Sequence, residues 1–319
     1  MSLSEFVTLF LRHGPNVILY PGAFDPHPRV LHAPSKWNLD YEDLTLITED
    51  KVKIHAYLLQ VKKMKRDSRL SVPFEESCPV IIMFHGNSDN IGFTIPLAKK
   101  FYQDFHCNVL MLSPRGYGKS GGTPSTKGFQ RDADTALQYI LSHPDLSKSR
   151  IILYGQSMGG AMAIDLAGRK SDKISALIVE NTFTSLCSLI PDVMPSCTLV
   201  APFFRQWNSK RTLERLPYSI TILMLSGEND EVIPPVHMHQ LWKAACGPRK
   251  NSAGPPGLKK RNTKDGKSPD STPNSNTKES LTEEIIERKG KFVSFPNRRH
   301  NNTCEDKNYW KTIREFLET

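Results

Sequence analysis

Short runs of apolar residues recur along the chain, and most of them have the length of a β-strand. Glycine, proline and polar residues separate the runs, which are rich in Val, Ile and Leu. This pattern predicts eight strands, at residues 42–49, 52–60, 79–85, 107–113, 150–154, 174–180, 219–226 and 291–296. The first two flank Asp50 and Lys51 and are predicted to form an antiparallel hairpin.

Helical patterns lie between the later strands. In one of them, Ala133, Leu137 and Ile140 fall on a single helical face. The predicted helices span residues 92–104, 130–143, 158–170, 236–246 and 306–318. From the third strand onward the strands are almost continuously apolar, as a parallel sheet covered on both faces requires. The alternation predicts an α/β fold with a mostly parallel eight-stranded sheet and helices on both faces.

The composition of the chain changes in residues 247–280. This segment has five prolines, four glycines and almost no large apolar residue, so it cannot bury enough surface to offset its ordering entropy. We predict a disordered insert, placed at a helix-to-strand connection and therefore away from the carboxyl-end edge of the sheet. The remaining organisation is an N-terminal extension over residues 1–40 and one domain over residues 41–319.

Net charge does not indicate a nucleic-acid partner. The chain carries +9, from 42 basic and 33 acidic residues, but residues 247–280 hold eight Lys or Arg and only three Asp or Glu. The rest of the chain is therefore only mildly basic, and no basic face with stacking aromatic residues is visible.

The cysteines and the N-terminal residues indicate the cellular compartment of the protein. None of the six cysteines has metal-ligand spacing, which favours reduced thiols in a reducing compartment, here the cytoplasm. The apolar run Phe6–Leu11 is too short to cross a bilayer and has no basic segment before it, so we expect neither a signal peptide nor a transmembrane helix. It suits either a helix packed on the domain or an amphipathic helix in peripheral contact with a membrane.

A possible nucleophile stands at one strand-to-helix junction. The pattern G-x-S-x-G runs from Gly155 to Gly159 with Ser157 at its centre. Such a serine can sit on a sharp turn that exposes its hydroxyl group. An ordinary glycine-rich turn has the same letters, so the remaining chain must supply a base, an acid and an oxyanion pocket.

The chain offers a base and an acid in the order that this chemistry uses. A serine hydroxyl needs a base of near-neutral pKa, and a histidine in that role needs an acid to orient it. Asp230 follows the seventh predicted strand, and His300 follows the eighth. With Ser157 after the fifth strand, all three fall on the same edge of the sheet. Glu228 and Glu231 remain alternatives for the acid.

Other polar residues near these positions have simpler interpretations. His237 and His239 are predicted to be rim or surface residues, because side chains two apart on a helix diverge and would not share a metal. Glu180 and Asn181 end the sixth predicted strand at the same edge, where a capping role is favoured over a role in the site. The segment from Arg115 to Ser120 lacks the glycine that a phosphate-binding loop needs. It is predicted to be a turn beside the loop after the third strand, residues 84–92, which we call the oxyanion loop.

Two backbone N–H groups are candidates for an oxyanion hole. One belongs to Met158, directly after the nucleophile, at the positive end of a helix. The other belongs to Asn87, in the glycine-containing loop after the third strand. No metal and no organic cofactor is expected. A further segment, 183–215, is a candidate cap, and its apolar residues suit either an acyl-chain groove or ordinary core packing.

Taken together, these motifs resemble those of the α/β-hydrolase superfamily, in particular the group of α/β-hydrolase domain-containing protein 13 and its fungal Bem-type relatives. The resemblance covers most of residues 40–318 and rests on HGNSDNIG, PRGYGKSGG, YGQSMGGA, ENTFTS, GENDEVIPP and RHNNT. It implies the α/β-hydrolase fold and a serine hydrolase with the triad Ser157, Asp230 and His300. The YGQS and HGN motifs are also similar to those of protein-depalmitoylating hydrolases. Relatives in this group usually begin with a membrane-spanning anchor, which we do not find here.

The sequence therefore predicts a serine hydrolase that cleaves carboxylic ester or thioester bonds. Its expected partners are an acyl ester or thioester substrate, such as a lipid or an acylated protein, and a membrane surface in peripheral contact. Two alternatives stay open. An amidase or peptidase can use the same triad, and a binding protein can keep the fold without the chemistry.

Overall fold

The structure is a computed structural model and describes residues 8, 11–25, 30–61, 78–88, 90–204, 206–247 and 288–319. Except for Gly247, the predicted insert at 247–280 lies outside the described residues. Its place in the chain is as expected, since it joins the helix that ends at Cys246 to the strand that begins at Gly290.

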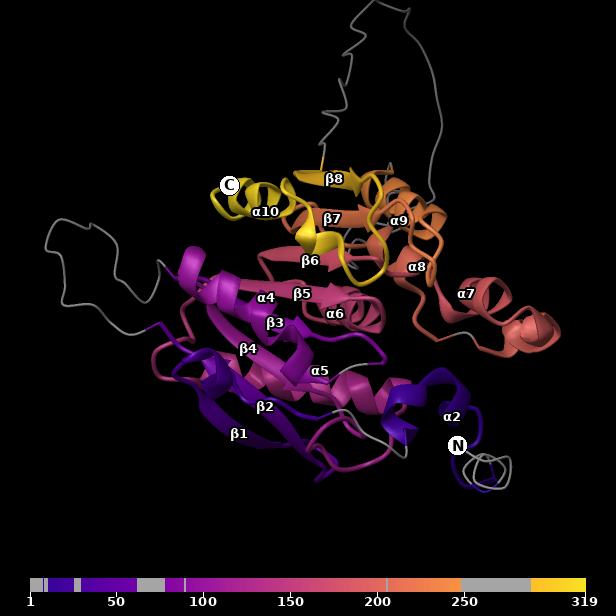
Figure 1. Cartoon of the computed structure of the whole chain (residues 1–319), viewed down its shortest axis with the longest axis horizontal. Helices are drawn as coiled ribbons and strands as arrows, with labels where there is room; N and C mark the ends of the chain where they lie inside the picture. The colour runs from indigo at the N-terminus through magenta and orange to yellow at the C-terminus, as the bar shows by residue number, and fades with distance from the viewer. Residues whose placement is uncertain are drawn as a thin grey trace, which may run out of the picture.

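Eight strands form a single sheet in the order β1-β2-β4-β3-β5-β6-β7-β8 (Figure 1). The strands are β1 (Glu42–Ile47), β2 (Lys53–Leu59), β3 (Val80–Phe84), β4 (Asn108–Ser113), β5 (Ile151–Gln156), β6 (Ala176–Glu180), β7 (Thr221–Gly227) and β8 (Gly290–Phe295). The pairs β1–β2 and β2–β4 are antiparallel, and every later pair is parallel. The mostly parallel eight-stranded sheet and its hairpin are therefore confirmed.

The five predicted helices are present, together with several short ones that the apolar pattern did not show. The helices are α2 (Asn16–Leu19), α4 (Ile91–Asp104), α5 (Thr126–Ser142), α6 (Met158–Arg169), α7 (Leu186–Val193), α8 (Ser209–Leu213), α9 (Val236–Cys246) and α10 (Tyr309–Leu317). Short 3₁₀ segments are η1 (Pro21–Phe24), η2 (Pro34–Trp37), η3 (Pro195–Phe203) and η4 (Thr303–Glu305).

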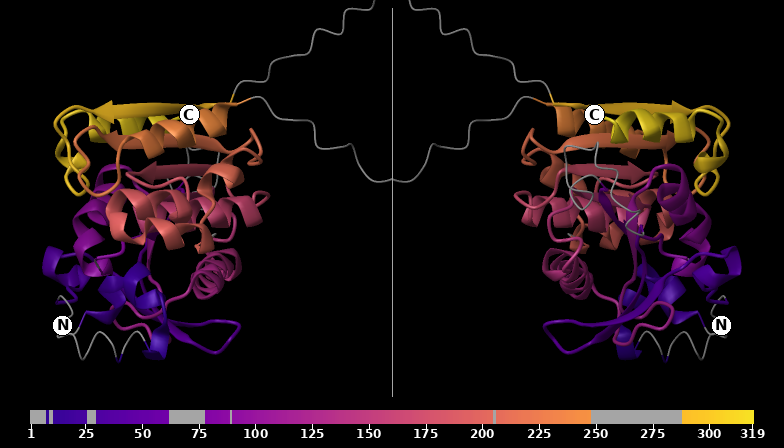
Figure 2. Two further views of the ribbon diagram at one scale, coloured as in Figure 1. Left: turned by 90° about the vertical axis from the view of Figure 1, so that its right-hand side faces the viewer. Right: turned by 90° about the vertical axis from the view of Figure 1, so that its left-hand side faces the viewer.

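The sheet separates two apolar cores. Alternate residues of β3 point to opposite faces, so Ile82 packs with α5, α6 and α9, whereas Ile81 packs with α4 and α10. Helices on both faces, as predicted, bury the central strands completely. Figure 2 shows the order along the sheet, from β1 near the N-terminal segment to β8 beside the C-terminal helix.

The carboxyl ends of the parallel strands mark one end of the molecule. The short helix α2 from the N-terminal segment and α7 from residues 183–215 both lie at this end, on the right in Figure 1. The N-terminal segment and the predicted cap segment thus meet at the edge where the sequence places its candidate catalytic residues.

Candidate active site

Ser157 connects β5 directly to α6 through a strained backbone. Its φ is 55° and its ψ is −122°, a conformation that side-chain-bearing residues rarely adopt. The Ser157 N–H donates to the Glu180 carbonyl oxygen at the end of β6 (3.0 Å). The turn is therefore sharp and fixed from the neighbouring strand, as a nucleophile elbow requires.

The glycines around Ser157 are needed because the backbone is so crowded. A Cβ atom on Gly155 would collide with the Gly159 carbonyl group, and one on Gly159 would collide with the Phe84 carbonyl group. A side chain on Gly160 would meet Thr182, whose hydroxyl donates to the Ser157 carbonyl oxygen (2.7 Å). The strand, the elbow and the helix can approach this closely only without side chains.

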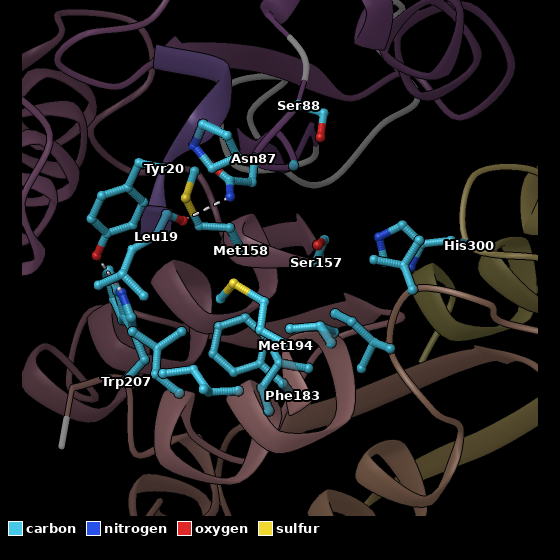
Figure 3. A pocket seen from close by; sticks show the side chains of 18 of the residues that line it. Leu19, Tyr20, Asn87, Ser88, Ser157, Met158, Phe183, Met194, Trp207 and His300 are labelled. Carbon is cyan, nitrogen blue, oxygen red and sulfur yellow. Dashed lines mark hydrogen bonds between the residues drawn. The ribbon is translucent and has the colours of Figure 1, made fainter. Parts of the chain in front are cut away.

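His300 and Asp230 form a buried pair next to Ser157. His300 Nδ1 lies 2.8 Å from Asp230 Oδ2, and the side chains are 7% and 1% exposed. Ser157 and His300 both line one pocket, where they lie beside each other (Figure 3). The three residues predicted from the sequence are thus brought together at the carboxyl ends of β5, β7 and β8.

Asp230 is the carboxylate that faces the His300 ring. Its second oxygen, Oδ1, accepts the backbone N–H groups of Val232 and Ile233, each at 2.8 Å. Both oxygens are therefore occupied, and the carboxylate cannot rotate freely. Glu231 instead accepts the backbone N–H of His300 from its exposed position (3.4 Å).

The sequence predicts the backbone N–H groups of Met158 and Asn87 as oxyanion donors. Met158 begins α6, so its N–H has no partner within the helix. Asn87 lies in the turn after β3. Among the hydrogen bonds of the described residues, neither N–H has an acceptor, so both are available to an oxyanion.

The side chain of Asn87 ties the oxyanion loop to distant parts of the chain. Its Nδ2 donates to the Leu19 carbonyl oxygen (2.8 Å), and its Oδ1 accepts the Tyr117 hydroxyl. Leu19 belongs to the N-terminal segment, and Tyr117 to the glycine-rich turn after β4. That turn packs beside the oxyanion loop, as the sequence predicts.

Asn181 supports the loop that carries His300, whereas its position in the sequence favoured a capping role. Its Nδ2 donates to the His300 carbonyl oxygen (2.9 Å) and to Thr303 Oγ1 (2.8 Å), while its Oδ1 accepts the Gly227 N–H (2.8 Å). Its φ is 44°, which asparagine tolerates better than most residues. The capping alternative is wrong, because Ser185 caps the next helix. An Asn that ends a buried strand was the available signal.

Glu180 is a buried carboxyl behind the same loop. It accepts the Tyr154 hydroxyl (2.7 Å) and the Tyr309 hydroxyl at the same oxygen, Oε2. Burial raises the pKa of this carboxyl, although the two tyrosine hydrogen bonds act in the opposite direction. The neutral form of Glu180 therefore persists to higher pH than that of an ordinary glutamate.

His237 is not the rim or surface residue that its sequence position predicts. It is buried, with Nδ1 2.9 Å from Thr184 Oγ1 and Nε2 2.9 Å from Asp192 Oδ2 on α7. His239, by contrast, is exposed and packs on Phe292. No group of three or more potential metal-ligating side chains occurs among the described residues.

A pocket of about 420 Å³ adjoins Ser157. Its walls come from the N-terminal segment, the oxyanion loop, the elbow, α7 and the Asp230 and His300 loops (Figure 3). Its apolar lining includes Leu186, Leu189, Ile190, Val193 and Met194. Within the described part of the chain, no Asp, Glu, Lys or Arg lines this pocket.

Comparison with known proteins identifies similar chains along the whole length. The family described as "Serine aminopeptidase, S33" matches residues 75–214. The chain is 36% identical to the protein bem46 of Schizosaccharomyces pombe over 97% of this chain and 87% of that protein. It is 29% identical to "Uncharacterized membrane protein YNL320W" of Saccharomyces cerevisiae, over 99% and 93%.

Solved structures show the same fold at much lower identity. The esterase Pf2001 of Pyrococcus furiosus superposes with a TM-score of 0.62 at 16% identity, over 91% of this chain and 95% of the esterase. Among the described residues, no helix is both long enough and apolar enough to cross a membrane.

Proposed function

Because the chain belongs to the α/β-hydrolase family of serine hydrolases that includes the fission yeast protein bem46, we propose that it cleaves carboxylic esters or thioesters with an apolar acyl chain. The observation that carries this proposal is the pocket beside Ser157. Its lining is largely apolar, and its described walls hold no charged Asp, Glu, Lys or Arg side chain. Such a site suits the hydrocarbon part of an acyl group and disfavours a charged one.

In the proposed mechanism His300 removes the proton from the Ser157 hydroxyl as its oxygen attacks the acyl carbonyl carbon. The negative charge that develops on the carbonyl oxygen is held by the N–H groups of Asn87 and Met158. Asp230 keeps the proton-bearing Nδ1 of His300 oriented and stabilises the imidazolium.

The intermediate collapses when the bond to the alcohol or thiol breaks and His300 returns the proton to that leaving group. Water then attacks the acyl-enzyme and gives up a proton to His300. The acid leaves, and the proton returns to the Ser157 oxygen. No metal or organic cofactor takes part in this cycle.

A peptidase is the second candidate, because the matching family is described as a serine aminopeptidase. An enzyme that binds a free α-amino group needs an acceptor for its ammonium charge, usually a carboxylate. The described walls of this pocket offer no carboxylate, and Asp230 turns its oxygens to His300 and to backbone N–H groups. We therefore place ester and thioester cleavage ahead of amide cleavage.

The proposal is tested by labelling the wild type and Ser157→Ala with a fluorophosphonate, followed by octanoyl ester, octanoyl thioester and octanoyl amide substrates. We expect labelling of the wild type only, and a loss of at least about a thousandfold in kcat/KM for Ser157→Ala. The ester and thioester should react faster than the amide, and longer acyl esters faster than acetyl. Two folded but unlabelled proteins would favour a binding protein without catalysis.

Peripheral membrane contact belongs to the same proposal. Leu199 and Phe203 on η3 are 91% and 80% exposed, next to the α7 wall of the pocket, and the budding yeast relative is named a membrane protein. Exposed apolar side chains favour a lipid surface. The wild type should float with phosphatidylcholine vesicles, and the Leu199→Ser and Phe203→Ser double variant should not. Equal flotation of both would contradict this contact surface.

A further inference from the structure

Tyr20 and Trp207 stand at the side of the pocket opposite His300. Both line the pocket, and Figure 3 shows them far from Ser157 and His300, with Met158, Phe183 and Met194 in between. Tyr20 comes from the N-terminal segment and Trp207 from the connection between η3 and α8. An acyl chain that starts at Ser157 and runs along the apolar walls would meet these two rings at its far end.

The two rings are held by polar contacts as well as by packing. Trp207 Nε1 donates to the Tyr20 hydroxyl (3.1 Å), which also lies 3.1 Å from Thr126 Oγ1 on α5. Tyr20 and Trp207 are 2% and 5% exposed, so this hydrogen-bonded group is removed from water. A buried group whose polar atoms are all paired has little freedom to swing aside.

Phe129 on α5 supports both rings from behind. It meets Tyr20 edge-on with a centroid distance of 4.9 Å, and it stacks on Trp207 at 6.3 Å with an interplanar angle of 24°. α5 is a helix of the main domain, packed against the sheet. The Tyr20–Trp207 pair is therefore fixed to the core, although its members come from two peripheral segments.

The backbone of Trp207 is strained. Its φ is 53°, in the left-handed region that bulky residues avoid. Such a conformation costs free energy and persists where surrounding contacts impose it, and strained residues cluster at functional sites. At Trp207, contacts with Tyr20 and Phe129 hold the indole ring at the end of the pocket.

From this geometry we propose that Tyr20 and Trp207 form the end wall of the acyl pocket and set the longest acyl chain that the enzyme accepts. The inference rests on the proposed function. It makes Trp207 a residue that determines specificity, at a distance from the reacting atoms.

The test compares hydrolysis of acetyl, butyryl, octanoyl, dodecanoyl and palmitoyl esters with one leaving group. For the wild type, kcat/KM should rise with chain length to an optimum and then fall. Trp207→Ala removes the wall, so the optimum should move to longer chains, with about a fourfold gain for each further methylene that becomes buried. Trp207→Phe keeps a ring in place and should keep the wild-type optimum.

Trp242→Ala is the matched control, since Trp242 on α9 packs on Phe292 and does not line the pocket. It should leave the optimum unchanged. Thermal unfolding is measured for every variant, and Tyr20→Leu is a second opening variant if Trp207→Ala does not fold. Fluorophosphonate labelling of Ser157 shows that the catalytic serine is intact in each.

Three results are decisive. No decline for long chains in the wild type would show that the pocket has no end wall. A wild-type optimum that stays in place in folded, labelled Trp207→Ala and Tyr20→Leu would show that other residues form it. No labelling and no hydrolysis at any chain length would contradict the proposed function, and this inference would fall with it.

Discussion

Asp230 uses each of its carboxylate oxygens differently. Oδ2 faces His300 Nδ1, and Oδ1 accepts two backbone N–H groups of its own turn. Because the turn holds the carboxylate, the orientation of the His300 ring depends on backbone geometry. Activity should therefore depend on the negative charge of Asp230, and a substitution that keeps the shape of the side chain but removes this charge tests that dependence.

Asp230→Asn keeps the shape of the side chain but replaces the charge that stabilises the imidazolium. We expect kcat/KM for an octanoyl ester to fall on the order of 10⁴-fold with little change in the unfolding temperature. Glu231→Gln is the control, because Glu231 accepts the backbone N–H of His300 while Asp230 faces the His300 ring, and it should retain activity within about threefold. A larger loss for Glu231→Gln than for Asp230→Asn would reverse the assignment of the acid.

Glu180 gives a prediction about stability and pH. Burial raises its pKa above the ordinary value of 4.5, so at pH values between the two the folded protein binds more protons than the unfolded chain. Stability from this group is therefore full below pH 4.5 and is lost as pH rises toward the folded-state pKa.

Glutamine at position 180 cannot ionise. Denaturant unfolding of Glu180→Gln should therefore show a smaller loss of stability than the wild type shows as the pH rises above 4.5. The comparison variant is Glu231→Gln. A hydrogen bond from its own backbone N–H lowers the pKa of Glu231, so that variant should not reduce the loss. Parallel pH profiles for the wild type and Glu180→Gln would contradict the prediction.

The residues of the triad could be predicted because they follow strands, and strand ends are visible in the apolar pattern. Asn181, Tyr20 and Trp207 could not, because their roles depend on contacts with partners far along the chain. Trp207, for instance, reaches a hydroxyl group 187 positions away. The surface prediction for His237 is wrong for the same reason, since helical spacing does not show that its ring contacts Asp192 on α7.

At the scale of elements, three strand ends are joined through one side chain. Asn181 follows β6, donates to the loop after β8 and accepts from the last residue of β7. It therefore sets the position of His300 relative to Asp230, without contact to a substrate. This is a positioning role.

Asn181→Gly keeps the positive φ accessible but removes every hydrogen bond of the Asn181 side chain. We expect kcat to fall roughly tenfold to a hundredfold with KM nearly unchanged, because the base is displaced and the acyl pocket is not. Thr303→Val, which removes only one acceptor of Asn181, should give a smaller effect. An increase in KM alone would indicate that Asn181 acts on the pocket instead.

The long elements were predictable and the short ones were not. β3 to β7 are buried runs rich in Val, Ile and Leu, a pattern that is typical of strands covered on both faces. α7 and η3 are short, and each contains an internal proline, Pro191 and Pro202. The packing of these segments around the pocket, and not their intrinsic preference, sets their conformation.

At the scale of the whole molecule, both ends of the connection between α9 and β8 contact the same side chain, that of Tyr218. The Tyr218 hydroxyl donates to the Gly247 carbonyl oxygen (2.9 Å), and the Arg288 guanidinium lies over the Tyr218 ring at 4.9 Å. Arg288 also donates to the carbonyl oxygens of four residues, Ala245, Leu216, Pro217 and Ile220. Both ends are thus fixed by contacts within the described domain.

Replacement of residues 248–287 by a short Gly/Ser linker should therefore leave the enzyme folded and active. The connection enters β8 at the strand end opposite the loop that carries His300, so kcat/KM should stay within about twofold. Stability should change by no more than about 1 kcal/mol, as expected for a shorter loop. Thermal unfolding and ester hydrolysis measure both. A selective loss of activity in a folded variant would place the replaced segment near the site.

The position of β8 has a consequence for how the protein responds to heat. Among the described strands, β8 pairs only with β7, and the first residues of β8 are exposed, in contrast to the buried β5. An edge strand of this kind opens at a smaller free-energy cost than the whole domain unfolds. The loop that carries His300 follows this strand directly. We therefore expect warming to detach β8 before the rest of the sheet unfolds, and the loss of activity that follows should be reversible while most of the sheet is intact.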